Sequence, residues 1–424
     1  MNTIFAPITG RGGAVTVLRL SGPETLTITA ALVKTLPQPR HAGLRKLVWG
    51  RLLDTALVVT FPAPNSFTGE DCAEFSLHGG RAVLAAVSEA LIAAGARPAE
   101  PGEFSRRAHL NGRLDLLEAE AMADLIAAET EAQRRLAVEG ASVLQEACAR
   151  WREELRQVMA QQEALIDFPD EDLPREVEER LLGRIGTLAT EMHAALVAAP
   201  AAERLREGLE FVILGPPNAG KSTLMNALAG EDVAIVSAIP GTTRDIVGTR
   251  VDFAGVPVHL TDTAGLRDTV DEIEAEGVRR ARHRAARADL IIAVAAGPNP
   301  EFLGVPPGIE ILRVVTKADL LDRELPDLAV SAAIGTGMAA LRERLAAIAA
   351  ALTDTKGAAA LSRPRQIACV RDTAQALDRA LALDEPELRG EELRSAALAL
   401  ARLTGQIGVE EILDAVFLGF CIGK

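Results

Sequence analysis

Long apolar runs are missing from this sequence, and aromatic residues make up only 3% of it. A transmembrane helix needs about 20 consecutive, mostly apolar residues, and no segment here reaches that length. The chain is therefore not expected to cross a membrane. Its first residues, MNTIFAPITG, contain neither a basic nor an apolar segment, so we expect no export signal.

Cysteine is also scarce and is not paired. The four cysteines are Cys72, Cys148, Cys369 and Cys421, and no two of them form a CxxC motif. This usage is typical of a reduced, cytoplasmic setting and argues against a structural zinc site. The six histidines show no metal-ligand spacing, which favours structural or surface roles for them.

The net charge of −14 at first argues against a nucleic-acid partner. The charge is uneven, however. Basic residues slightly outnumber acidic ones in residues 1–118, whereas acidic residues clearly dominate residues 119–207. Because an acidic chain can still present a basic face, the net charge does not exclude RNA. The sequence does not show where such a face lies, and basic residues such as Arg106 and Arg107 are candidates no better than their surroundings.

A length of 424 residues predicts two or three domains. In residues 1–118 the short β-like runs AVTVLRL, LVWGRLL and ALVVTF alternate with glycine and proline and with one helical stretch, RAVLAAVSEALIAAGA. This pattern indicates a small α+β domain.

Residues 119–207 consist mainly of helix formers, interrupted where Pro169 and Pro174 occur. Residues 208–357 then alternate strand, loop and helix, which is typical of a parallel sheet covered by helices. Helical sequence returns in residues 358–424. We therefore predict one helical domain into which a nucleotide-binding α/β domain is inserted. The helical residues expected to pack inward are Leu144, Trp151, Leu155, Val158, Met159, Leu165 and Ile166.

The strongest motif is FVILGPPNAGKST, which follows a β-like run and opens a helical one. Gly215 is separated by four residues from Gly220, Lys221 and Ser222. Glycines let backbone N–H groups surround phosphate oxygens, and the helix N-terminus favours negative charge. Lys221 is expected to reach the β and γ phosphates, and the Ser222 hydroxyl to ligate Mg²⁺.

Three further motifs complete a GTP-binding set. Asp262 in VHLTDTAGL ends an apolar run and is expected to hold Mg²⁺ through water, and the Gly265 N–H can meet the γ-phosphate. In TKAD, Asp319 can accept from the guanine N1–H and amino group, while Thr316 stands where Asn is usual. SAAIGTG, from Ser331, fits the loop behind the base. With the switch residue Thr243, the predicted nucleotide contacts are Ala219, Gly220, Lys221, Ser222, Thr223, Asp262, Thr263, Ala264, Gly265, Thr316, Lys317, Asp319, Ser331 and Ala332.

The residue that activates water is not evident from these motifs. The position occupied by Gln in Ras-like enzymes is Leu266 here, which can neither transfer a proton nor form a hydrogen bond. The acids Asp271, Glu272, Glu274 and Glu276 follow, and the residues alone do not choose among them.

Charge on the transition state must also be neutralised. Arg244, beside the Mg²⁺-ligating Thr243, is one candidate, acting as an arginine finger supplied by the same chain. A bound monovalent cation is the other.

These residues and their surroundings resemble the MnmE (TrmE) family of tRNA modification GTPases over nearly the whole chain. The N-terminal motifs are GRGGAVTVLRLSGP, NSFTGEDCAEFSLHGG and PGEFSRRAHLNGRLDLLEAEAMADLI. The GTPase motifs are GPPNAGKSTLMNALAG, AIVSAIPGTTRD and DTAGLRDTVDEIEAEG, and FCIGK matches the C-terminus.

The resemblance implies a multidomain α/β protein: an N-terminal α+β domain that dimerises and binds a formylated tetrahydrofolate, a helical domain, and an inserted P-loop (Ras-like) α/β GTPase domain. It implies a homodimer that hydrolyses GTP with Mg²⁺ and K⁺. It also implies a flavoprotein partner of the MnmG type, with which an aminomethyl-type group is added to C5 of the wobble uridine of certain tRNAs.

Site residues carry over by position. Glu274 matches the catalytic glutamate that orients or polarises water, and K⁺ takes the place of Arg244 when two GTPase domains meet. Arg19 and Glu74 match folate-contacting positions, and Arg113 stands where Lys is common. The implied K⁺ ligands are Asn218, Ser237, Ile239 and Thr242.

The final segment raises a separate question about Cys421. CIGK has the outline of a prenylation box, but Gly423 is not aliphatic and no polybasic segment precedes it. EEILDAVFLGFCIGK instead predicts a last helix followed by a short tail. The resemblance implies that this tail points toward the folate pocket, so Cys421 is expected to take part in modification. Its role as nucleophile, acid/base or positioned polar group stays open, with plain packing as the alternative.

Two other functions are compatible with parts of the sequence. A regulatory or ribosome-assembly GTPase, acting as a conformational switch, would explain the GTPase motifs but not the N-terminal motifs or the tail. A stand-alone folate-dependent one-carbon enzyme would leave four GTPase motifs unexplained.

Overall fold

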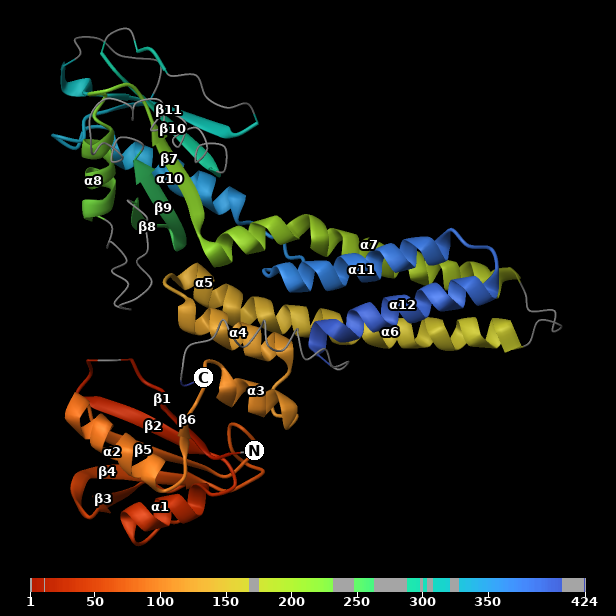
Figure 1. Cartoon of the computed structure of the whole chain (residues 1–424). Helices are drawn as coiled ribbons and strands as arrows, with labels where there is room; N and C mark the ends of the chain where they lie inside the picture. The colour runs from red at the N-terminus through yellow and green to blue at the C-terminus, as the bar shows by residue number, and fades with distance from the viewer. Residues whose placement is uncertain are drawn as a thin grey trace, which may run out of the picture. The chain divides into compact units, whose positions relative to one another are not determined.

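The computed structural model describes residues 2–10, 12–167, 175–231, 248–262, 288–297, 300–302, 308–320, 328–405 and 423. The chain divides into two compact units, Met1–Ala123 with Ala401–Lys424 and Asp124–Leu400. Figure 1 labels the helices and strands of both. None of the helices in these described ranges is long and apolar enough to cross a membrane.

The first unit contains a six-stranded sheet with the order β3-β4-β5-β2-β1-β6. Neighbouring strands are antiparallel except β1 and β6, which are parallel. The strands are β1 (Ile4–Pro7), β2 (Val15–Ser21), β3 (Gly43–Trp49), β4 (Arg51–Phe61), β5 (Cys72–His78) and β6 (Arg97–Pro98). The helices are α1 (Thr25–Val33), α2 (Arg81–Ala93) and α3 (Glu103–Leu110), and α4 (Leu116–Ala127) follows.

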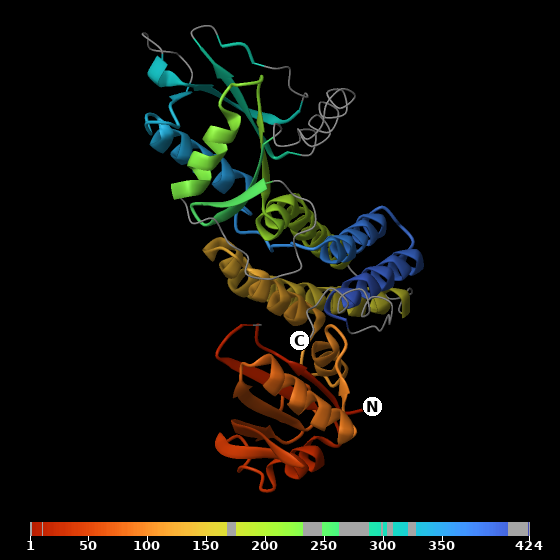
Figure 2. The same ribbon diagram turned by 60° about the vertical axis from the view of Figure 1, so that its left-hand side comes forward.

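Helices α1 and α2 cover one face of this sheet (Figures 1 and 2). Leu18 and Leu20 of β2 are fully buried there. Because side chains alternate along a strand, Arg19 and Ser21 belong to the opposite face. The register of β2 and β5 sets Arg19 opposite Glu74, so two residues far apart in sequence become neighbours.

One of the predicted β-like runs belongs to two strands. The run LVWGRLL forms the end of β3, a turn and the start of β4, because Gly50 adopts a φ of 67° and Trp49 pairs with Arg51. Glycine enters the left-handed region without steric cost, so the chain reverses at this point. The other β-like runs, AVTVLRL and ALVVTF, lie in β2 and β4, and RAVLAAVSEALIAAGA forms α2, as predicted.

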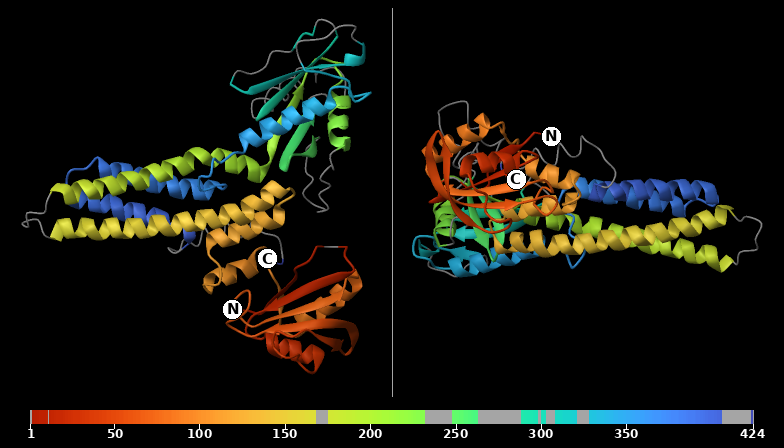
Figure 3. Two further views of the ribbon diagram at one scale, coloured as in Figure 1. Left: turned by 180° about the vertical axis from the view of Figure 1, so that it is seen from behind. Right: turned by 90° about the horizontal axis from the view of Figure 1, so that it is seen from below.

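The second unit contains short and long helices outside its sheet. They are α5 (Glu131–Arg135), a π-helix (Leu136–Gly140), α6 (Ala141–Asp167), α7 (Arg175–Glu207), α11 (Pro364–Leu381) and α12 (Pro386–Thr404). Helix α7 lies beside both α6 and α11 (Figures 1 and 3). Leu144, Trp151, Leu155 and Val158 are buried as predicted, whereas Met159, Leu165 and Ile166 are half-buried.

The helical sequence from residue 119 onward contains a break that was not predicted. Helix α4 ends at Ala127, and Thr130 starts the next helix by a capping box in which its hydroxyl accepts from the Gln133 N–H. A Thr followed three residues later by Gln is a sequence signal for such a start.

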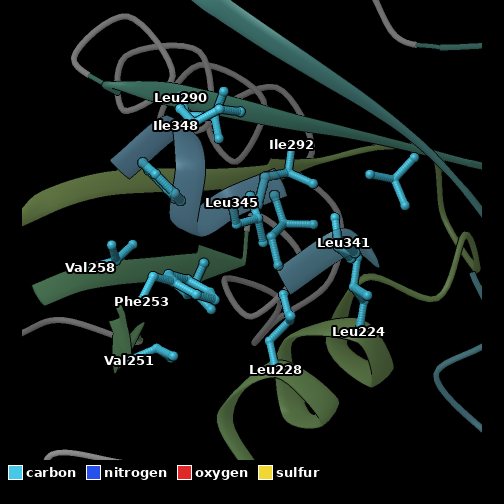
Figure 4. Close-up of a cluster of buried hydrophobic side chains, with 14 of the residues drawn as sticks. Leu224, Leu228, Val251, Phe253, Val258, Leu290, Ile292, Leu341, Leu345 and Ile348 are labelled. Atoms are coloured by element: carbon cyan, nitrogen blue, oxygen red, sulfur yellow. The ribbon is translucent and has the colours of Figure 1, made fainter. Parts of the chain in front are cut away.

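A second six-stranded sheet has the order β12-β11-β10-β7-β9-β8. Strand β8 is antiparallel to β9, and the other neighbours are parallel. Apolar residues of α8 and α10 pack against one face of it, as Figure 4 shows for Leu224, Leu228, Leu341, Leu345 and Ile348. The strands are β7 (Leu209–Leu214), β8 (Gly248–Phe253), β9 (Val256–Asp262), β10 (Leu290–Ala296), β11 (Glu310–Thr316) and β12 (Leu328–Val330). The helices are α8 (Lys221–Glu231), a 3₁₀ turn (Ala318–Leu320) and α10 (Met338–Leu352).

The two segments that join this sheet to the helices lie next to each other. Arg206 Nε, at the end of α7, donates to the Ser362 carbonyl over 2.7 Å. Gln133 Nε2 donates to the Arg206 carbonyl over 3.0 Å. The turn between β8 and β9 is attached to the same region, because the Ala132 N–H donates to the Gly255 carbonyl.

Candidate nucleotide-binding site

The loop between β7 and α8 has the geometry that the P-loop motif predicts. Gly215 follows β7, and a Cβ at this position would lie 2.2 Å from the Val294 carbonyl oxygen, so only glycine fits against β10. Asn218 and Gly220 have φ values of 60° and 82°. Asn and Gly are the residues that tolerate this conformation best, and it turns the loop backbone around on itself.

Lys221 begins α8 and is 7% exposed. Its Nζ donates to the carbonyls of Gly215 and Pro216 over 3.0 and 2.9 Å. The ammonium group therefore lies inside the loop that a phosphate chain would occupy, with its charge held by backbone oxygens. This is the position from which a P-loop lysine reaches phosphate oxygens.

Ser222 and Asp262 meet at the same end of the sheet. Ser222 Oγ donates to Asp262 Oδ2 over 2.6 Å, and Asp262 is 2% exposed at the end of β9. A hydroxyl and a carboxylate are the hard oxygen donors that Mg²⁺ takes beside phosphate. The described part of the predicted Mg²⁺ site thus fits the ion.

The base side of the site is formed by two loops. Thr316 ends β11 and is 3% exposed, Lys317 adopts a φ of 56°, and Asp319 is exposed in the 3₁₀ turn. Ser331 follows β12, is 1% exposed, and its hydroxyl has no hydrogen-bond partner within the described residues. Ala332 is half-buried beside it. The structure therefore brings the P-loop, Asp262 and the predicted base-reading residues to the same edge of the sheet.

Several predicted site residues lie outside the described ranges. They are Ser237, Ile239, Thr242, Thr243, Thr263, Ala264, Gly265, Glu274 and Cys421, and their assignments stay predictions. Of the four K⁺ ligands, only Asn218 is described, and it is exposed in the P-loop.

Arg19 and Glu74 form a second polar site in the first unit. Arg19 Nε and Nη2 lie 3.0 and 2.9 Å from Glu74 Oε1. The Arg19 guanidinium stands over the rings of Phe67 and Phe104, 4.6 and 5.7 Å from their centres. Sequence reasoning missed both phenylalanines, although Phe67 and Phe104 lie within motifs that carry the family resemblance. Arg113 is exposed, and its stem lies next to Gly69.

Arg107, one of the basic residues considered for an RNA-binding face, is buried and therefore not part of one. Its side chain is 5% exposed and forms ion pairs with Glu70 at 3.1 Å and with Glu103 at 2.9 Å. Burial raises the pKa of the Glu103 carboxyl, but hydrogen bonds from Arg97, the Glu100 N–H and Arg107 outweigh it, so the pKa falls below its ordinary value of 4.5. Arg107 therefore stabilises the first unit from within.

The C-terminal tail is described at Gly423. This residue is buried, has a φ of 103°, and a Cβ there would lie 2.2 Å from the Pro7 carbonyl oxygen. Pro7 ends β1, and its neighbour Ala6 is paired with Arg19. The last glycine is thus held at the β1 edge of the strand that carries Arg19.

The fold and the site define a P-loop nucleotide-binding protein that carries an additional α+β unit and a helical region. Comparison with family models finds two matches: residues 3–113 match the GTP-binding protein TrmE N-terminus, and residues 116–421 match the MnmE helical domain. The chain belongs to the tRNA modification GTPase MnmE family. The predicted multidomain fold class, with an N-terminal α+β part, a helical part and a P-loop α/β part, is confirmed.

The relatives are similar over their whole lengths. A tRNA modification GTPase MnmE of Acidiphilium cryptum is 59% identical, over 100% of this chain and 99% of the relative. That of Gluconacetobacter diazotrophicus is 52% identical, over 99% and 98%. Among solved structures, the G domain of the T. maritima FeoB iron transporter is 24% identical. The match covers 33% of this chain and 98% of the transporter domain, with a TM-score of 0.26.

Proposed function

We propose that this protein hydrolyses GTP and, with a flavoprotein partner of the MnmG type, adds an aminomethyl-type group to C5 of the wobble uridine of certain tRNAs. The observation that carries this proposal is that one chain of this family holds both a P-loop with its Ser222–Asp262 pair and the Arg19–Glu74 pair. A plain GTPase switch has no use for the second site.

GTP is the substrate of the first site. The glycine-rich turn offers backbone N–H groups to the phosphates, and Lys221 supplies a positive charge there. Ser222 and Asp262 would hold Mg²⁺, which neutralises charge on the phosphate oxygens. Asp319 selects guanine by accepting from its N1–H and amino group.

Hydrolysis needs an oriented water and a further positive charge. Glu274 orients the water, because the Ras-like glutamine is replaced by Leu266. Asn218, Ser237, Ile239 and Thr242 hold K⁺, whose charge replaces an arginine finger when the GTPase domains of two copies meet.

The second site suits a formylated tetrahydrofolate. A pterin ring is flat and carries N–H donors, which matches the half-buried ring of Phe67 and the carboxylate of Glu74. When bound, this group supplies a one-carbon unit. Arg19 orients the Glu74 carboxylate through its ion pair with Oε1, and Arg113 adds positive charge. Cys421 acts from the tail, whose Gly423 is held beside β1.

This function implies a homodimeric, cytoplasmic protein with tRNA as its macromolecular substrate. It also gives each part of the chain a role. Residues 1–118 bind folate and dimerise, residues 208–357 hydrolyse GTP, and residues 119–207 with residues 358–424 form the helical domain.

The test is mass spectrometry of wobble-uridine nucleosides in tRNA from cells that lack the gene, with and without the wild-type copy restored. Loss of 5-aminomethyl-type uridines that returns with the wild-type copy is the expected result. A restored copy with Cys421→Ser should hydrolyse GTP normally and fail to restore the nucleosides. Unchanged nucleosides in the deletion strain would contradict the proposal and favour the regulatory or ribosome-assembly GTPase.

A further inference from the structure

Thr316 joins the phosphate side of the site to the base side through one hydroxyl. Its Oγ1 lies 2.5 Å from the carbonyl oxygen of Ala219 in the P-loop and 3.1 Å from that of Ala295 in β10. A Cβ at Gly220 would lie 3.7 Å from the same hydroxyl. The side chain is 3% exposed, so these contacts are shielded from water.

The same residue starts one base-side loop and lies beside the start of the other. Thr316 is the last residue of β11, and Lys317 with its φ of 56° turns the chain toward Asp319. Across the sheet Thr316 pairs with Val330, directly before Ser331. Movement of Thr316 would therefore shift the P-loop and both base-side loops together.

The chemistry of a hydroxyl limits what else Thr316 can do. A hydroxyl has one proton, whereas the Asn that is usual at this position has two amide N–H donors and a carbonyl acceptor. The hydroxyl has two neighbours in space, the carbonyls of Ala219 and Ala295, and both are acceptors, so its one proton is already used. Only lone pairs remain. Guanine presents acceptors at N7 and O6 on its Hoogsteen edge, to which lone pairs cannot bond.

We propose that Thr316 is a positioning residue that holds the P-loop against the base-side loops and that this site binds guanine nucleotides without reading N7. The inference rests on the proposed binding of GTP. Selection of guanine over adenine then depends on Asp319 and the loop at Ser331, while Thr316 contributes equally to the affinity for every nucleotide that fits the site.

The first experiment uses the wild-type full-length chain. GTP and 7-deaza-GTP, in which a C–H replaces N7, compete with a fluorescent GDP analogue in Mg²⁺ buffer. We expect the two dissociation constants to agree within about twofold, because no hydrogen bond to N7 is lost. A preference for GTP of tenfold or more would overturn the inference. Failure to bind GTP at all would overturn the proposed function, and the inference with it.

Two variants test the tether itself. Thr316→Val keeps the shape and removes the hydroxyl, so affinity for GTP, GDP and 7-deaza-GTP should fall together by about tenfold, the effect of one buried hydrogen bond. The ratio of GTP to ITP affinity, which reports Asp319, should not change. Thr316→Asn should instead create a several-fold preference for GTP over 7-deaza-GTP.

Thr190→Val is the matched control, because Thr190 Oγ1 donates to the Gly186 carbonyl over 2.8 Å on an exposed face of α7. It should bind all nucleotides like the wild type. Wild-type affinity in Thr316→Val would overturn the positioning role. If circular dichroism shows that Thr316→Val does not fold, the comparison of GTP with 7-deaza-GTP in the wild type and in Thr316→Asn still tests the inference. A Thr316→Asn variant that does not prefer GTP over 7-deaza-GTP would contradict it.

Discussion

Ser222 Oγ donates to Asp262 Oδ2 over 2.6 Å, which connects the first turn of α8 to the last residue of β9. The pair lies between the P-loop and the end of a parallel strand, where a metal ion beside phosphate needs oxygen donors. Two motifs 40 residues apart in the chain thus form one potential Mg²⁺ site.

Ser222→Ala should weaken GTP binding at least tenfold in Mg²⁺ buffer and change it little in EDTA, because the lost hydroxyl acts through the metal. Titration of a fluorescent GTP analogue in both buffers measures the difference. Ser142→Ala, which removes an exposed hydroxyl bonded to the Val138 carbonyl in the helical region, is the control. An equal loss in both buffers would show that Ser222 supports the loop and not the metal.

Potassium should stimulate hydrolysis strongly. At equal ionic strength, GTP turnover should be several-fold faster in KCl than in NaCl, and Asn218→Ala should remove the difference. Asn226→Ala, on an exposed position of α8, should keep it. Glu274→Ala should abolish turnover in either salt while binding persists. Equal wild-type rates in the two salts would exclude the K⁺ assignment.

Glu74→Gln should weaken binding of 5-formyltetrahydrofolate about tenfold without changing GTP hydrolysis. The carboxylate that pairs with Arg19 becomes a neutral amide, and charge-assisted hydrogen bonds are about twice as strong as neutral ones. Isothermal titration calorimetry measures the affinity. Glu89→Gln, exposed on α2, is the matched control. Unchanged affinity in Glu74→Gln would remove Glu74 from the folate site.

Gly423→Ala should uncouple modification from hydrolysis. The added methyl group would meet the Pro7 carbonyl oxygen at 2.2 Å, and a φ of 103° is unfavourable for alanine, so the tail must leave its place. GTP turnover should stay normal while nucleoside mass spectrometry shows a large loss of modified uridine. Gly10→Ala, where no heavy atom lies within 4 Å, should behave like the wild type. Normal modification in Gly423→Ala would mean that this contact does not position the tail.

The stability of the first unit should fall in acid because of Glu103. Its pKa in the folded protein is below the ordinary 4.5, so the carboxylate stabilises the fold at pH values above about 4.5 and this contribution is lost as the pH falls through the folded pKa. Glu103→Gln should destabilise the unit by about 1–3 kcal/mol at pH 7 and flatten the dependence of its stability on pH below about 4.5.

In a Trp151→Phe background, Trp49 is the remaining tryptophan and reports the unfolding of the first unit by its fluorescence. Glu89→Gln again serves as the control. If the stability of the first unit falls with acid equally in the Trp151→Phe protein with and without Glu103→Gln, another group causes the acid sensitivity.

The sequence predicted the P-loop, Asp262 and the base-side loops because each of these residues is required by local chemistry. The tether from Thr316 to Ala219 could not be predicted, since it depends on how β11 approaches the P-loop across the sheet. The same holds for the two rings beside Arg19 and for the burial of Arg107, which depend on pairs far apart in sequence. The helix start at Thr130 was predictable from its Thr-x-x-Gln spacing.

The contact between Arg206 and Ser362 has a consequence for the history of the chain. Because Arg206 Nε lies 2.7 Å from the Ser362 carbonyl, the helical segments before and after the intervening sheet meet at its base. A linker of a few residues could join them, and α7 would still lie beside α11. Insertion of a nucleotide-binding domain into one loop of a helical protein would produce this architecture. A chain from which residues 208–357 are deleted should still fold its helices.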